Sequence, residues 1–362
     1  MTIYCILFIT IFLIKMISTR SIYSGNIEFA RKNKNDETIA LFVVCSIIFL
    51  LMGLRGTSVG CDLVQYVHRY KILSYDSIYN TSEWGYNILC YFFRDILHLD
   101  FQWLIIFVSL LLMSSFYFCF KSFSEDWLIS VIFYLTLGTF TLAMSGVRQT
   151  ISIALCNYAI FFVKKRKLIP FILFVLIAST FHNSALVFLI TYFMYGIRFT
   201  RKSAAICFFV FLLGFIFRRY IVELINIVRP PKYSNIDLSE GYSINPLVIL
   251  APIIINIYSL LFIPTDSCGR FTKKDSFFFL LSCVYVLTLI LSLNNNQLGR
   301  LGFYFSIGQM INVATAVKNH KQSNFMEGTI MFVLIILFCL AYFFISTPGG
   351  TLGIDKYTFF WD

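Results

Sequence analysis

The sequence has few charged residues for its length. Charged residues make up 13% of its 362 positions, against roughly 25% in a typical soluble domain. Hydrophobic residues make up 59%, and the mean hydropathy is +0.80. This composition excludes a soluble domain. The formal charge of +11 does not indicate nucleic-acid binding, because most of it falls in short connections between apolar segments, as membrane insertion requires.

The sequence also lacks the short motifs of several enzyme classes. There is no Walker loop and no GxGxxG, so nucleotide chemistry is not indicated. No group of His, Cys and carboxylate residues has metal-ligand spacing, and we expect neither a metal nor another cofactor. The ten cysteines show no CxxC spacing, and most lie in apolar segments. Cys61 and Cys90 lie outside these segments and could pair, which the sequence alone does not decide.

Long apolar segments are what the chain has in abundance. There are about twelve, and those of roughly 17–20 residues can span a bilayer. We therefore expect an all-α polytopic integral membrane protein that forms a single membrane domain over residues 1–362. The segments lie near residues 2–18, 37–54, 101–120, 127–144, 147–163, 168–181, 183–197, 203–222, 245–263, 275–293, 300–317 and 327–346.

Basic residues divide the connections into two sets. The positive-inside rule assigns lysine-rich connections such as Lys164–Lys167 to the cytoplasm and places both termini outside. On this assignment the inner connections carry 6 Arg and 11 Lys, and the outer ones carry 8 Arg and 3 Lys. Arginine suits two-pronged recognition of phosphate and carboxylate. We therefore predict that an anionic ligand is handled on the external face.

Two external connections are long. Residues 55–100 contain amphipathic stretches at 62–73 and 84–98, which are too polar to span and should lie at the membrane interface. Residues 223–244 contain a proline pair followed by a polar run, and they should form a mobile cap or lid.

The first candidate site follows the glycines that end the second segment. If a helix begins near Asp62, then Asp62, Tyr66 and Arg69 share one face at i, i+4 and i+7, beside Arg55. A carboxylate, a phenol and guanidinium groups would then lie together. The alternative is a glycine loop in which Asp62 is a helix N-cap and the arginines reach lipid phosphates.

The second and third candidates lie at outer helix ends. Ser145 is a plausible N-cap for the segment that carries Arg148 and Gln149, and such a helix start attracts anions. His182 stands at the polar junction of two short segments, a broken hairpin of the kind that lines water-filled cavities. Its ordinary pKa suits a general base or a phosphate-binding imidazolium. The alternatives are a lipid anchor for Arg148 and a satisfied polar residue for His182.

Further candidates lie near the outer rim. Arg300 and Tyr304 are spaced i, i+4 after four consecutive amide residues, which suit sugar hydroxyls, although a polar turn would look the same. Glu83 adjoins aromatic residues, as in saccharide sites or in an interfacial aromatic belt. Three other arginines could bind phosphate or anchor the interface: Arg218, Arg219 and Arg229.

The ordered set of these pieces resembles the EpsG-like branch of the Wzy polysaccharide polymerases. The matching pieces span residues about 53–305, and two positions depart from the family pattern. Cys61 replaces a small hydroxyl residue, and Asn183 stands where a basic residue is expected. The matching pieces are Gly53-Leu54-Arg55, Val59-Gly60-Cys61-Asp62 with Tyr66, Glu83-Trp84-Gly85-Tyr86, Ser145-Gly146-Val147-Arg148-Gln149, Phe181-His182-Asn183-Ser184-Ala185-Leu186 and Gly299-Arg300-Leu301 with Tyr304-Phe305.

The resemblance implies a metal-independent glycosyltransferase of the bacterial inner membrane, facing the periplasm. It would join oligosaccharide repeat units carried on undecaprenyl pyrophosphate, as in O-antigen, capsule or exopolysaccharide synthesis, with membrane lipid and a chain-length regulator as partners. Arginines would hold the pyrophosphates. A base would activate the acceptor hydroxyl, with His182 ranked before Asp62 and Glu83.

Other classes of membrane protein share some of these features. A lipid-linked oligosaccharide flippase should carry charges within its spans and often internal repeats, whereas here the charges cluster at the outer rim and no repeat is detected. An O-antigen ligase would use nearly the same donor site with a different acceptor, so the arginines at the rim do not exclude it. A membrane acyltransferase would place its catalytic histidine within a span, whereas His182 lies at an end.

Overall fold

The computed structural model describes residues 1–19, 27–228, 247–293, 296–348 and 353–362. Within these ranges every regular element is a helix, which confirms the all-α prediction. The elements are α1 (Thr2–Thr19), α2 (Ile27–Gly53), α3 (Leu63–Ile72), η2 (Tyr75–Ser77), α4 (Trp84–Tyr91), η3 (Phe92–Ile96), α5 (Phe101–Phe123), α6 (Trp127–Thr136), α7 (Thr139–Ser145), α8 (Val147–Lys164), α9 (Leu168–Phe181), η4 (Asn183–Ile190), α10 (Thr191–Met194), α11 (Arg201–Val228), α12 (Leu247–Phe262), α13 (Lys273–Leu291), α14 (Asn296–Gly302), α15 (Ile307–Ser323) and α16 (Phe325–Ser346).

Six of the described helices are long and apolar enough to cross a membrane: α1, the later part of α2, α5, α11, α13 and α16. The pair α6 and α7 counts as a seventh span, bent by 52° beside Gly138, whose φ is +90°. Three other expected segments form shorter apolar helices, at Leu168–Phe181, Asn183–Met194 and Ile249–Phe262. Segment 300–317 is not one helix, since turns separate α14 from α15. The chain is a polytopic helical membrane protein.

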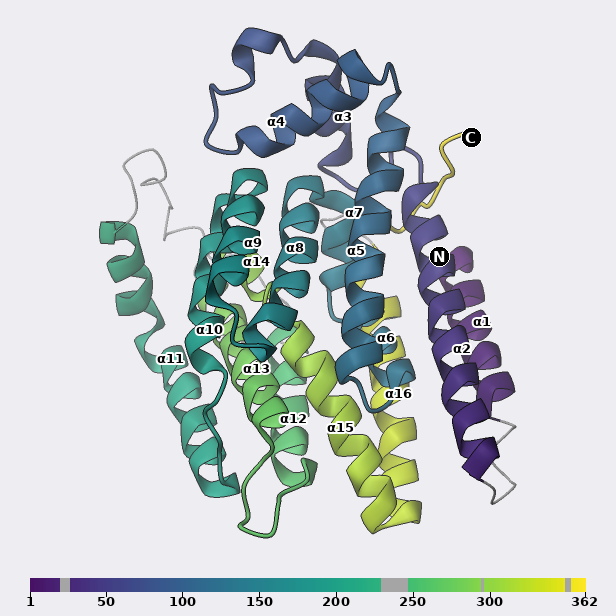
Figure 1. Ribbon diagram of the computed structural model, residues 1–362, viewed down its shortest axis with the longest axis vertical. Coiled ribbons are helices and arrows are strands. Elements are labelled where there is room, and N and C mark those ends of the chain that lie inside the picture. Colours follow the sequence, from purple (N-terminus) through teal and green to yellow (C-terminus); the bar gives the residue numbers. More distant parts are fainter. Residues whose placement is uncertain (20–26, 229–246, 294–295, 349–352) are drawn as a thin grey trace. The chain divides into compact units, whose positions relative to one another are not determined.

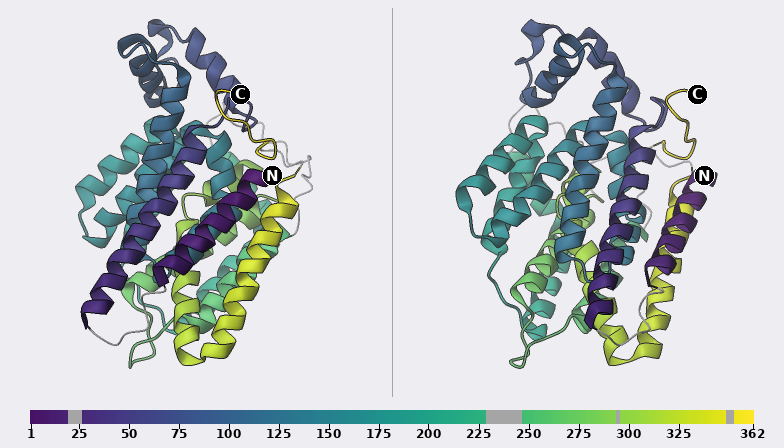
Figure 2. Two further views of the ribbon diagram at one scale, coloured as in Figure 1. Left: turned by 90° about the vertical axis from the view of Figure 1, so that its right-hand side faces the viewer. Right: turned by 45° about the vertical axis from the view of Figure 1, so that its right-hand side comes forward.

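The chain forms two compact units, and the first comprises residues 1–123, 127–186 and 337–362. In it α1 packs on α2, α2 on α5, α5 on α8 and α8 on α9. Helices α3 and α4 lie together at one end of these helices (Figure 1), where α4 packs on α9. The N-terminal amino group donates to the Asp355 carbonyl at 3.2 Å, so the N-terminus lies beside the C-terminal segment (Figure 2). Whether the chain is a single domain stays a prediction.

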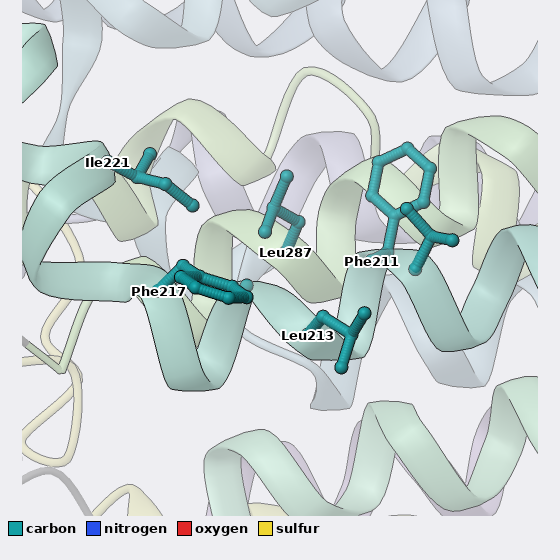
Figure 3. A pocket seen from close by; sticks show the side chains of 7 residues that line it. Phe211, Leu213, Phe217, Ile221 and Leu287 are labelled. Carbon is teal, nitrogen blue, oxygen red and sulfur yellow. The ribbon is translucent and has the colours of Figure 1, made fainter.

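The second unit comprises residues 124–126 and 187–336 and is organised around α13. This helix packs against α11, α12, α14 and α15, and most of its side chains are buried. An apolar cavity of about 340 Å³ lies where α11 meets Leu287 of α13 (Figure 3). No charged side chain lines that cavity.

Candidate active site

His182 stands where α9 stops. Its backbone is extended, with φ −153° and ψ 114°, and its N–H still donates to the Ala178 carbonyl at 3.1 Å. The helix therefore ends at the preceding residue, and η4 begins at Asn183. This confirms the predicted break at residue 182. The imidazole therefore lies at the junction between the end of α9 and the start of η4.

Glu83 reaches His182 from the start of α4. It is the residue before that helix, but its carboxylate makes no capping hydrogen bond to α4. Instead Oε1 lies 2.6 Å from Nδ1 of His182 and 3.4 Å from the backbone N of Asn183. Gly85 makes this possible, because a Cβ there would lie 2.2 Å from Oγ1 of Thr180 on α9. The absence of a side chain at residue 85 lets α4 approach the end of α9.

Arg148 completes the group from the first turn of α8. Its Nη1 forms an ion pair with Oε2 of Glu83. Its Nε donates to the Tyr66 hydroxyl at 3.4 Å, and the guanidinium lies 5.5 Å from the centre of the Tyr66 ring. We call Glu83, Arg148, His182 and Tyr66 the Glu83 cluster. Its members come from four separate elements, the connection before α4, α8, the end of α9 and α3.

The Glu83 cluster is partly open to solvent. Side-chain exposure is 13% for Glu83 and 30% for both Arg148 and His182. Burial opposes ionisation of Glu83, but the hydrogen bond and charge of His182, the Arg148 charge and the Asn183 N–H together hold the Glu83 pKa below its usual 4.5. Glu83 is therefore a carboxylate at neutral pH. It bridges a histidine and an arginine that both remain accessible to a ligand.

Two further predicted residues lie on the α3 side of this region. Arg69 donates from Nη2 to Oδ1 of Asn87 at 3.1 Å, which ties α3 to α4. Asp62 occupies the N-cap position of α3, although its side chain makes no capping bond. Its backbone N–H donates to Oγ of Ser145 at 3.2 Å. The sequence predicted Ser145 as the N-cap of α8. That prediction is wrong, because Gly146 takes the N-cap position.

Arg55 does not join the Glu83 cluster. Its side chain is 2% exposed and donates to the Met52 carbonyl at the C-terminal end of α2. The C-terminal segment covers it, since Gly56 N–H donates to the Thr358 carbonyl at 2.9 Å and Phe360 N–H to the Leu54 carbonyl at 3.0 Å. A cation at a helix C-terminus is favourable for the helix dipole. In this structure Arg55 is buried at the C-terminal end of α2 and lines no open site.

The remaining predicted residues are placed as follows. Gln149 is buried within α8. Arg218 is bound to its own helix, because it donates to the Phe215 carbonyl at 3.0 Å and lies 4.6 Å from that ring, while Arg219 is exposed. Arg300 is half-buried in α14 and Tyr304 is buried in the turn after it, both in the second unit. Arg229 lies outside the described residues.

The geometry also bears on metal binding and on cysteine pairing. Within the described ranges, no group of three or more His, Cys, Asp or Glu side chains could hold a metal ion. Cys61 is an exposed free thiol and Cys90 a buried one, so the pairing that the sequence left open is not formed.

Comparison with known protein families gives a match over most of the chain. The family model described as the EpsG family matches residues 38–359. The chain belongs to the EpsG family. No curated protein and no solved structure shows significant similarity to it. Family membership supports a general role as a polysaccharide polymerase of the glycosyltransferase type, in a membrane-embedded protein.

The region matched to the EpsG family contains the whole Glu83 cluster. Sequence reasoning named each of its members but had no means of pairing Glu83 with His182. It missed Asn87, which binds Arg69 and donates from Nδ2 to the Ile78 carbonyl at 2.9 Å. It also missed Gly85 as a contact residue. A glycine directly after Glu83-Trp84, at the start of a helix, was the available signal, because glycine inside a helix needs a packing reason.

Proposed function

We propose that this EpsG-family protein polymerises polysaccharide by joining repeat units carried on undecaprenyl pyrophosphate, at the external face of the bacterial inner membrane and without a metal. The single observation that carries the proposal is the Glu83 cluster. It combines a histidine positioned by a carboxylate with an accessible arginine, the two groups that transfer from a pyrophosphate leaving group requires.

In this mechanism His182 is the general base. The Glu83 carboxylate is hydrogen-bonded to Nδ1 of His182. This bond fixes the ring orientation and favours the tautomer whose Nε2 accepts a proton. The acceptor hydroxyl gives its proton to Nε2, and its oxygen bonds to the anomeric carbon of the donor glycan. The bond from that carbon to the pyrophosphate oxygen breaks, and the electron pair leaves with the lipid pyrophosphate. Glu83 thereby acts through His182 as a positioning residue.

Arg148 is proposed to stabilise the departing pyrophosphate. It lies in the first turn of α8, where the helix dipole also favours an anion. Its ion pair with Glu83 and its contact with Tyr66 hold the guanidinium beside His182. Base and anion-binding group are therefore held by one shared carboxylate, which suits a single reacting centre.

The surface beside the Glu83 cluster suits a lipid-linked substrate. Along α4 and η3 the side chains of Trp84, Ile88, Phe92 and Ile96 recur at every fourth position and are 37–56% exposed. Such an apolar stripe on a short amphipathic helix is typical of a segment lying in the membrane interface. A site beside that helix would meet pyrophosphate groups at the depth of the lipid headgroups.

The test is chain-length analysis of the glycan made by cells or membranes that contain single variants. His182→Ala should abolish long chains while protein level and binding of the lipid-linked unit stay near normal, because loss of a general base costs about 10²–10⁴-fold in rate. His68→Ala, which changes an exposed histidine of α3, is the matched control and should leave chain length unchanged.

Arg148→Lys is the companion variant. A lysine keeps the charge but loses the planar two-pronged geometry, so polymerisation should fall although the protein is produced normally. Arg198→Lys, at an exposed position of the lysine-rich side, serves as its control. If His182→Ala still yields full-length chains, the base assignment is wrong. If these variants still join repeat units to one another normally but no longer transfer glycan to a different acceptor, the ligase alternative replaces polymerisation.

A further inference from the structure

The second unit contains a group of neutral polar side chains buried among α12, α13 and α15. Each is at most 1% exposed, and none belongs to the Glu83 cluster. We call these residues the α12–α15 polar group. Its members are Asn256, Ser259, Ser282, Gln309 and Asn312.

Hydrogen bonds between these helices show how α12 and α15 are aligned along their length. Ser282 Oγ donates to Oδ1 of Asn256. Gln309 donates from Nε2 to the same oxygen at 3.2 Å and to the Pro252 carbonyl at 2.8 Å. Further along, Asn319 donates to the Phe262 carbonyl at 3.0 Å. Residue numbers rise together on α12 and α15, so the two helices run parallel.

That register places Asn312 near the level of Ser259, one turn beyond the bonds made by Gln309. Both residues lie on the same helical faces as the bonded pair, since Ser259 follows Asn256 and Asn312 follows Gln309 at i+3. The polar group is therefore continuous along one seam between α12 and α15.

The seam leaves several polar atoms without a protein partner in the part of the chain that the structure describes. They are Asn256 Nδ2, Ser259 Oγ, Gln309 Oε1 and both side-chain polar atoms of Asn312. An unmet polar group away from water is strongly destabilising. Five such atoms along one seam are more than a stable helix packing tolerates without a ligand.

The chemistry of these atoms selects the ligand class. A cation would satisfy the oxygens of Gln309 and Asn312 but would leave the amide N–H groups unmet, and an anion would do the reverse. No acidic or basic side chain belongs to the group. A neutral molecule that both donates and accepts satisfies every atom. Water has this property and is small enough for a site between packed helices.

We infer that the α12–α15 polar group is a water-binding site within the membrane domain. A buried water makes about three hydrogen bonds, so about two molecules would satisfy the five atoms. The site has no part in the proposed transfer chemistry.

The direct test is a structure of the full chain in a lipid bilayer at a resolution that shows ordered water. Density should lie within hydrogen-bonding distance of the Asn312 amide and of at least one of Ser259 and Asn256. Finding the five side chains bonded to one another with no density between them would overturn the inference.

A stability measurement gives an independent answer with a defined sign. Ser259→Ala removes a hydroxyl with little change in volume. If water is bound, Ser259→Ala removes hydrogen bonds between the Ser259 hydroxyl and that water, so Tm should fall about as much as in Ser115→Ala. Ser115 is equally buried, and its Oγ donates to the Leu112 carbonyl at 2.7 Å and accepts from Asn157 at 3.2 Å. In a dry site Ser259→Ala removes only an unmet group, and Tm should stay or rise.

The same assay separates water from an ion. The Tm of the wild-type chain should not depend on whether the buffer holds sodium, potassium or choline at equal ionic strength. A stabilisation specific to one cation, lost in Ser259→Ala, would show that the ligand is a metal cation and would overturn the assignment to water.

Discussion

Adding a single methyl group at Gly85 should disable the Glu83 cluster without altering any polar group. In Gly85→Ala the new Cβ would lie 2.2 Å from Thr180 Oγ1 and 3.0 Å from the Thr180 carbonyl carbon. Ordinary contacts begin near 3.4 Å. The start of α4 must therefore move away from the end of α9 by roughly 1 Å, because backbone of α9 blocks the approach as well as a side chain.

This displacement acts directly on the site. Glu83 lies two residues before Gly85, and His182 two residues after Thr180, so the 2.6 Å contact between the two side chains opens as the helices separate. A misplacement of about 1 Å between positioned groups costs about 100-fold in rate, which corresponds to about 2.7 kcal/mol of transition-state stabilisation.

Polymerisation by purified protein in lipid nanodiscs, with lipid-linked repeat units as substrate, measures this loss. Gly53→Ala is the control, because its Cβ would meet neighbours at 3.5 Å or more, and it should keep near wild-type activity. The melting temperature of both variants should stay close to that of the wild type. Full activity in Gly85→Ala would refute the reasoning, since contact of α4 with α9 would then not position the reacting groups.

Three further outcomes are expected. Glu83→Gln keeps the shape of the side chain but removes two charge-assisted hydrogen bonds, worth about 1.5–3 kcal/mol each, so turnover should fall at least about 10-fold; unchanged turnover would remove Glu83 from the mechanism. The pKa of Glu83 lies below its usual 4.5, so the stability that its ionised form contributes is fully present above pH 4.5 and is lost as the pH falls further. The difference in Tm between wild type and Glu83→Gln should accordingly shrink as the pH falls below 4.5, and a difference that does not shrink there would contradict the ion pairs. With the exposed native cysteines changed to serine, a cysteine at Asn80 should react with an impermeant reagent in intact cells, and one at Lys165 only after permeabilisation; the reverse pattern would invert the predicted topology.

Composition and local pattern were enough to establish the class of this protein. A chain with so few charges and so many apolar segments has no fold available in lipid except helices or a closed barrel, because backbone groups must be paired internally. Local signals also located the break at His182, since polar residues interrupt two apolar segments there. The same reasoning placed Arg148 in the first turn of a helix, although it chose Ser145 rather than Gly146 as the N-cap.

Only the tertiary structure decided which of these residues meet. The carboxylate of Glu83 contacts an imidazole 99 residues away and a guanidinium 65 residues away, and both contacts depend on α4 packing against α9 beside α8. The burial of Arg55 depends on a C-terminal segment about 300 residues away in sequence. Periodicity reports which face of a helix is polar, but it carries no information about the neighbour that face will meet. That choice is made by packing between whole helices, where a position without a side chain, such as Gly85, decides how closely two of them approach.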